Sequence, residues 1–202
     1  MSAAGKVCTG FSMPYVAKYS NVGSVVTYSG VMQLARGVSV SLSLDTTDDN
    51  VFHADNVSAE TAVAIFTGGT ATLTVDGLLA EAEKFILGLP ETTKVTAGGD
   101  QVDVSHYGDG MEIPYVGIGF VVRYQSGGVV TYAPVVLAKA RFQQPGLDAA
   151  TQEESIDWQT QELTATLMRD DTTNHDWKLV GADQSTEAAA ESVLKAILGG
   201  AA

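Results

Sequence analysis

The sequence contains a single cysteine, Cys8, among 202 residues. An intrachain disulfide needs two cysteines and a multi-cysteine zinc site needs more, so both are excluded. The chain also lacks a run of about 18 apolar residues, the length of a membrane-spanning helix, and its first residues lack the apolar stretch of a signal peptide. We therefore expect a protein without membrane contacts, made in a cytoplasm and folded by packing alone.

Basic residues are scarce as well. The chain has 11 Lys and Arg against 24 Asp and Glu, a formal net charge of -13. Such a chain repels phosphate backbones instead of collecting them, which argues against sequence-specific nucleic-acid binding. The same charge is compatible with a surface along which nucleic acid slides without adhering.

The motifs of enzymes and metal sites are missing too. No G-x-S-x-G nucleophile motif occurs, and the three histidines, His53, His106 and His175, form no H-x-x-x-H pair. Asp45, Asp48, Asp49 and Asn50 resemble a calcium loop only weakly, because its central glycine and terminal glutamate are absent. We therefore predict no catalytic residues, no metal and no cofactor.

Strict alternation of apolar and hydroxyl side chains is the strongest pattern present. It occurs in Val38–Leu44 (VSVSLSL), in Thr70–Val75 (TATLTV) and in Glu162–Leu167 (ELTATL). This period of two predicts strands with one buried face and one hydrated face. The simplest explanation is that Ser and Thr suit the exposed side of a strand. A second explanation is a smooth, hydrated wall that something passes or that another copy adjoins.

In the N-terminal half, we predict an irregular arm and short strands over Met13–Arg36, then a strand over Gly37–Leu44 that ends in a polar loop, Asp45–Asn50. Strands over Glu60–Thr67 and Thr70–Val75 would form a hairpin around Gly68-Gly69. Asp76 would cap a helix with an apolar stripe from Leu78 to Ile86, terminated by Gly88 and Pro90. Residues 91–110 would form a loop with a minor strand at 102–104.

The C-terminal half contains the densest apolar segment. Strands over Ile113–Tyr124 and Val129–Phe142 would flank a Gly127-Gly128 turn, with the first strand buried on both faces. We further predict a strand over residues 153–168, a turn at 170–174, an extended segment at 176–180 and a helix within Thr186–Leu198.

The order of these segments resembles a known family. The resemblance rests on the serine-rich strand, the HADN segment at 53–56, the strand-Gly-Gly-strand unit, PYVGIGF at 114–120, VVLAKARF at 135–142, WQTQELTATLMRDD and DWKLV. In this succession the chain is similar to major tail tube proteins of long-tailed phages, most closely to the phi13-type major tail proteins, over roughly residues 7–180. Tubes of contractile bacteriocin-like particles share the plan.

The resemblance implies a mainly β fold, a β-sandwich or half-barrel with one flanking helix at 77–87. We expect a tail tube domain at residues 1–182, with an N-terminal arm at 1–12. The C-terminal tail at 183–202 lies outside the resemblance; its composition predicts a short helix, and it would be either a docking helix or a disordered end. As a structural virion protein and not an enzyme, the chain would form stacked homohexameric rings that make the hollow tail tube through which the genome is delivered. Its partners would be the tape measure protein, the tail terminator and the tail tip or baseplate proteins, with DNA passing through the lumen unbound.

Two groups of residues follow as site hypotheses. Those expected to face the lumen or an adjoining sheet are Ser39, Ser41, Ser43, Thr70, Thr72 and Thr74. Residues 45–59 are expected to form an inter-ring loop that includes Asp45, Asp48, Asp49, Asn50, His53 and Asp55. The alternative function is a β-sandwich binding module for carbohydrate or a receptor, which an exposed row of aromatic residues or a bound calcium would favour.

Overall fold

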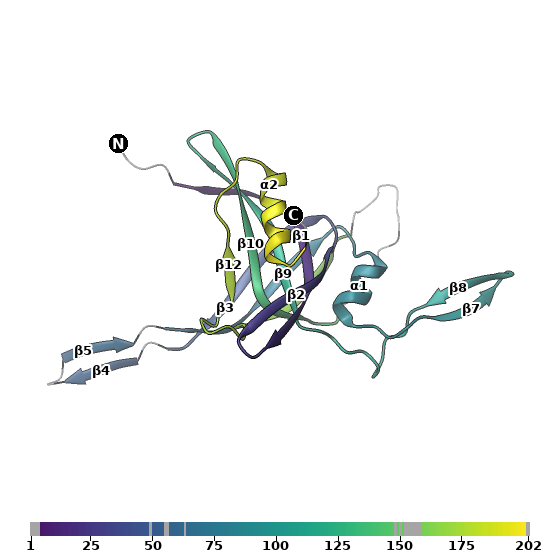
Figure 1. The fold of residues 1–202 in the computed structure, drawn as a ribbon, viewed down its shortest axis with the longest axis horizontal. Coiled ribbons are helices and arrows are strands. Elements are labelled where there is room, and N and C mark those ends of the chain that lie inside the picture. The colour runs from purple at the N-terminus through teal and green to yellow at the C-terminus, as the bar shows by residue number, and fades with distance from the viewer. Residues whose placement is uncertain are drawn as a thin grey trace.

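The computed structural model describes residues 5–48, 50–54, 57–62, 64–147, 149, 151 and 159–200. The fold is mainly β, with two short helices (Figure 1). Its elements are β1 (Val7–Val22), β2 (Val25–Gln33), β3 (Gly37–Thr46), β4 (Asn50–Ala54), β5 (Val57–Ala62), β6 (Phe66–Val75), α1 (Ala80–Leu87), β7 (Thr93–Ala97), β8 (Asp100–Val104), β9 (Val116–Ser126), β10 (Val129–Phe142), β11 (Gln161–Met168), β12 (Lys178–Val180) and α2 (Glu187–Ile197).

One antiparallel sheet dominates, in the order β2-β1-β9-β10-β11-β6-β3, and β12 pairs with β10 beside it. The sheet curls. Gly37, at the start of β3, lies against the Phe11 ring of β1, although β3 is the last strand in the order and β1 is the second. Together with the flanking helices, this curl confirms the predicted mainly β fold of the sandwich or half-barrel type.

The main core cluster lies on one face of this sheet. It joins fully buried side chains from both halves of the strand order, among them Leu73, Ile118, Leu137 and Leu163, with Ile86 of α1. Burial of such side chains supplies about 1.5–3 kcal/mol each. Because every long strand of the sheet contributes to this cluster or packs against it, the sheet and α1 form one packed unit.

A second cluster lies on the other face of β1, β9 and β10, where α2 covers the sheet. Thr186 caps α2 by accepting a hydrogen bond from the Ala189 amide at 3.2 Å. The helix approaches β9 closely because Gly119 has no side chain: a Cβ there would lie 2.6 Å from Leu194 Cδ1. The predicted burial of this strand on both faces is therefore confirmed, as is the C-terminal helix, and α2 is the helix that covers its second face.

The N-terminal third is more regular than predicted. An arm was expected at residues 1–12, followed by an irregular arm and short strands over Met13–Arg36. From Val7 onward, the structure instead has the long paired strands β1 and β2. Met13 has a positive φ of 54° and falls where the β1–β9 register shifts, so a bulge interrupts the alternation. That bulge hides the strand from a search for strict periodicity.

Gly68-Gly69 is not a turn, which corrects the predicted hairpin. Both glycines lie inside β6, and neither has the positive φ of a tight turn. A Cβ at Gly69 would lie 2.5 Å from the Ser43 carbonyl oxygen of β3, so glycine permits close approach of the neighbouring backbone. The partners of β6 are β3 and β11.

Helix α1 begins later than predicted. Its N-cap position is Leu79, without a side-chain cap, and Asp76 instead accepts hydrogen bonds from the amide and the guanidinium of Arg36 at 3.0 and 2.5 Å. Asp76 is thus bound to the Arg36 cation and does not cap the helix. The predicted stop is confirmed, because Gly88 adopts the left-handed conformation with φ 57°.

Two ribbons extend from opposite sides of the body (Figure 1). Strands β4 and β5 pair with each other and continue the β3–β6 hairpin outward, joined through hydrogen bonds between Thr47 and Ile65. Strands β7 and β8 form the second ribbon, where only a minor strand was predicted. In the C-terminal half, β11 begins at Gln161, within the strand expected over 153–168, whose residues 153–158 lie outside the described part.

Candidate functional site

The hydroxyl-bearing residues singled out in the sequence come together on one face. In the β3–β6 pair, Ser39 lies opposite Thr74, Ser41 opposite Thr72 and Ser43 opposite Thr70. The same threonines lie opposite β11, where Thr72 faces Thr164 and Thr70 faces Thr166. We call this set the hydroxyl face; its members are Ser39, Ser41, Ser43, Thr70, Thr72, Thr74, Thr164 and Thr166.

The hydroxyl face is hydrated because the intervening residues take the core. Leu73, Leu163 and Ala165 are fully buried beneath it, whereas the three serines are exposed and the threonines of β6 are half-buried. Directly paired residues in an antiparallel sheet lie about 5 Å apart. Ser39 donates a hydrogen bond of 3.0 Å to Thr74 across the strands. The result is a flat, uncharged surface without long side chains at its centre.

Charged side chains lie at the borders of this face. Glu162 lies opposite Thr74, and Arg141 of β10 lies opposite Thr166. Beyond one end, the pKa of Asp76 is lowered by its hydrogen bonds with Arg36, and this pair is solvent-exposed. The register places Arg141 at the edge of the hydroxyl face, with its Cζ 5.8 Å from the Tyr115 ring centre.

Both terminal strands of the sheet are open. Among the described residues, β2 pairs only with β1 and β3 only with β6. Proteins usually protect such edges with charged residues or proline. Strand β2 (VVTYSGVMQ) has neither, and β3 (GVSVSLSLDT) has one charge, Asp45. Unprotected edges on two sides of one sheet are the backbone feature that a neighbouring chain can complete.

The residues of the expected inter-ring loop are distributed along the first ribbon. Asp45 lies within β3, Asp48 follows it, and Asn50 and His53 belong to β4. Asp49 and Asp55 lie outside the described residues. A loop was predicted because polar residues dominate, but in its described part this segment is paired strand. An inter-ring role stays a prediction.

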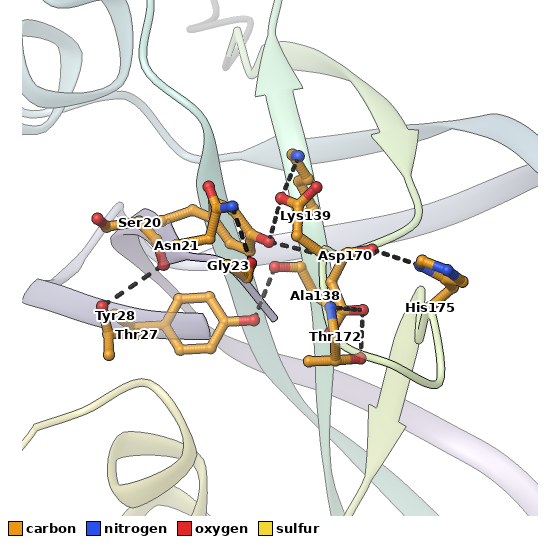
Figure 2. A network of polar contacts seen from close by, with 12 residues as sticks. Ser20, Asn21, Gly23, Thr27, Tyr28, Ala138, Lys139, Asp170, Thr172 and His175 are labelled. Atoms are coloured by element: carbon orange, nitrogen blue, oxygen red, sulfur yellow. Dashed lines mark hydrogen bonds and ion pairs between the residues drawn. The ribbon is translucent and has the colours of Figure 1, made fainter. Parts of the chain in front are cut away.

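A polar network holds the β1–β2 hairpin against the turn at 170–175 (Figure 2). Lys139 forms an ion pair of 2.6 Å with Asp171, and Tyr19 donates a hydrogen bond of 2.7 Å to the same carboxylate. Tyr28 donates to the Ala138 carbonyl at 2.7 Å, and Asp170, 5% exposed, accepts from the amide and the hydroxyl of Thr172. This network joins β1, β2 and β10 to the turn.

The titration behaviour follows from these contacts. Burial, then the hydrogen bond to Asp171, raises the pKa of Tyr19 to about 12. The hydrogen bonds from Lys139 and Tyr19 lower the pKa of Asp171. Both shifts favour the bonded state, a neutral phenol beside an ionised carboxylate, so they describe a structural contact.

In the part of the chain that the structure describes, no three His, Cys, Asp or Glu side chains lie close enough to hold a metal ion. His106 hydrogen-bonds Thr93 at 2.7 Å, and His175 lies 3.3 Å from the Asp170 carbonyl oxygen. None of the described helices has the length and apolar content needed to cross a membrane.

Comparison with known proteins leaves the resemblance as an expectation from the sequence. A scan against protein-family models found no match, and a search of curated proteins found no similar sequence.

The six members of the hydroxyl face on β3 and β6 were predicted from the sequence. Their position on one face follows from the alternation within each strand. Thr164 and Thr166 show the same alternation, and the pairing of β11 with β6 adds them to the site. The open edge of β2 was missed, because an irregular arm was expected there. Its only sequence signal is the absence of charge and proline in nine residues.

Proposed function

We propose that this protein is a structural subunit of a phage-type tail tube, which assembles with copies of itself into stacked rings around a channel for the genome. The observation that carries the proposal is the hydroxyl face bordered by the open edge of β3. This combination suits a wall shared between copies.

Strand edges support self-assembly in a ring. When β3 of one copy pairs with an open edge of the next, the contact uses different surfaces on the two copies. Such a contact forms a closed ring if the rotations between successive copies add up to a full turn. Ring closure covers every edge, as in a barrel. The resemblance adds two points to the proposal. Each ring would contain six copies, and the partners would be the tape measure, terminator and tip proteins.

The chemistry of the hydroxyl face suits passage of DNA. Each phosphate met by a basic side chain adds salt-dependent affinity, so a conduit has to keep basic side chains few. The centre of the face carries only hydroxyls, and the chain as a whole has a net charge of -13. With this face lining the channel, duplex DNA meets water and short neutral groups.

Electron microscopy of the purified, concentrated protein tests the proposal. We expect rings or tubes with a central channel, and a sedimentation profile that shifts to larger species as concentration rises. Particles that stay monomeric at every concentration and salt condition would contradict it.

A binding module is the second candidate, and one observation favours it. An open hollow of about 300 Å³ is lined by amide side chains, including Gln143, Gln144 and Gln161, beside Asp76 and Glu162. Amides and carboxylates bind sugar hydroxyls, although no aromatic residue is among its described lining residues. Glycan affinity in a persistent monomer would support this candidate over the first.

A further inference from the structure

The β7–β8 ribbon is built as an amphipathic element. Register places Val95 opposite Val102 and Thr93 opposite Val104 on one face, and Lys94 opposite Asp103 on the other. The two valines of the central pair are each 51% exposed, and Val104 is 38% exposed. The turn is specified by Gly98 and Gly99, both with positive φ. A defined ribbon therefore presents an apolar face that its own chain leaves in water.

Such a ribbon is marginal by itself. Two strands without a covering layer are scarcely stable in water, and an apolar face gains stability only when it is buried. In the described residues, β7 and β8 pair with each other alone, and the ribbon extends away from the body (Figure 1). A covering surface must come from another molecule.

A receiving surface lies at the other side of the body. A hollow of about 440 Å³ opens at the root of the β4–β5 ribbon, and we call it the root hollow. Its apolar part consists of Ile65, 56% exposed, and of the Phe66 and Trp177 rings, stacked with centroids 4.7 Å apart. A shallow apolar floor of this kind fits the flat valine face of a two-stranded ribbon.

Charge points to a second copy as the occupant. The ribbon and its following loop carry Asp100, Asp103 and Asp109 against Lys94 alone. The root hollow has the opposite balance, with Arg169 and Lys178 against Asp176. In a chain with a net charge of -13, a basic hollow is uncommon, and acidic ribbon and basic hollow are complementary.

We infer that the β7–β8 ribbon of one copy docks with its valine face in the root hollow of the next copy. The ribbon and the hollow lie on opposite sides of one body, so a chain cannot fill its own hollow, while copies in a row fill each other's (Figure 1). Every copy then gives one ribbon and receives one, a head-to-tail contact. This inference rests on the proposed function, because it names a contact of the same assembly.

A matched pair of variants tests the valine face. Val102→Glu and Gln101→Glu add the same charge at neighbouring positions of β8, on opposite faces of the ribbon. Because burial of a valine contributes enough for a tenfold change in affinity, Val102→Glu should raise the concentration for half-maximal assembly by about tenfold or more. Gln101→Glu should change it by less than about twofold, and both variants should melt at the wild-type temperature, because the ribbon lies outside the core.

Cysteine cross-linking identifies the receiving surface. In a Cys8→Ser background, Val102→Cys and Ile65→Cys in one chain should give disulfide-linked dimers and longer ladders under mild oxidation, whereas Gln101→Cys with Ile65→Cys should not. If the wild type assembles but the two glutamate variants behave alike and no ladder forms, the ribbon inference is wrong and the tube proposal stands. If the wild type never assembles and no ladder forms, both are wrong.

Discussion

Two halves of the same sheet surface contrast sharply. On the face that points away from the main core cluster, the half formed by β1, β9 and β10 is apolar and covered by α2, whereas the half formed by β11, β6 and β3 is hydroxyl-bearing and is covered by neither of the described helices. One sheet therefore carries both a surface for its own chain and a surface for water or another molecule.

The difference between the two halves arises from the residue types at corresponding strand positions. Val121 and Val136 pack under Leu194 of α2, while Thr72 and Ser41 occupy the corresponding face of their strands with hydroxyls. The first half is buried on both faces and stabilises the fold; the second is buried on one face and is available for function. The predictions below test this division, from the largest expected effect to the smallest.

Ile118→Ala should have the largest effect on stability. Ile118 is fully buried in the main core cluster on β9, and removing such a side chain costs about 2–5 kcal/mol of unfolding free energy, through lost burial and a cavity. Urea denaturation measures it. The control Val129→Ala, in the same sheet but 64% exposed, should change the free energy by less than about 0.5 kcal/mol. Equal effects would refute the assignment of this half as the stability centre.

Gly119→Ala should destabilise by about 1–3 kcal/mol, because its methyl group would lie 2.6 Å from Leu194 and 2.8 Å from Leu198 of α2. Gly10→Ala is the matched control, since the nearest atom to a Cβ at that β1 glycine lies 3.5 Å away, an ordinary contact. Thermal melting of both variants compares them. A Gly119→Ala protein as stable as the wild type would mean that α2 does not press on β9.

Tyr19→Phe should cost about 1 kcal/mol at neutral pH, because it removes the hydrogen bond to the Asp171 carboxylate. The folded-state pKa of Tyr19 is raised from 10.0 to about 12. Its stabilisation is thus fully present below pH 10 and is lost as the pH rises toward 12. Urea titrations at pH 8 and at about pH 11 should show the difference between wild type and variant shrinking. A constant difference would contradict this linkage.

Changes on the hydroxyl face should leave the monomer nearly unchanged. Thr72→Val keeps the shape of a half-buried side chain, and we expect a change in unfolding free energy below about 0.5 kcal/mol. Replacing Ser41 and Thr72 together by arginine should also leave the monomer folded, yet impair assembly or DNA passage, because it places two cations on the face. Unchanged tubes and unchanged infectivity would count against a role for this face in the channel.

Alternation was sufficient to predict strand structure over 38–44, 70–75 and 162–167, the alternating parts of β3, β6 and β11, and to predict that their hydroxyls share one face, because a period of two is imposed by the strand itself. The Gly127-Gly128 turn and the glycine stop of α1 were equally local and were predicted. By contrast, Gly68-Gly69 had the composition of a turn, but contact with a distant strand determines its conformation.

The amino-acid sequence alone thus determined the strand faces, the Gly127-Gly128 turn, the glycine stop of α1 and the excess of negative charge, since these depend on composition and on neighbours along the chain. Only the tertiary structure decided which strands adjoin, that α2 covers one half of the outer face, and that β2 and β3 end the sheet. The reason is physical: pairing partners and covering layers are chosen by contacts between residues far apart in the chain, and no local pattern encodes them.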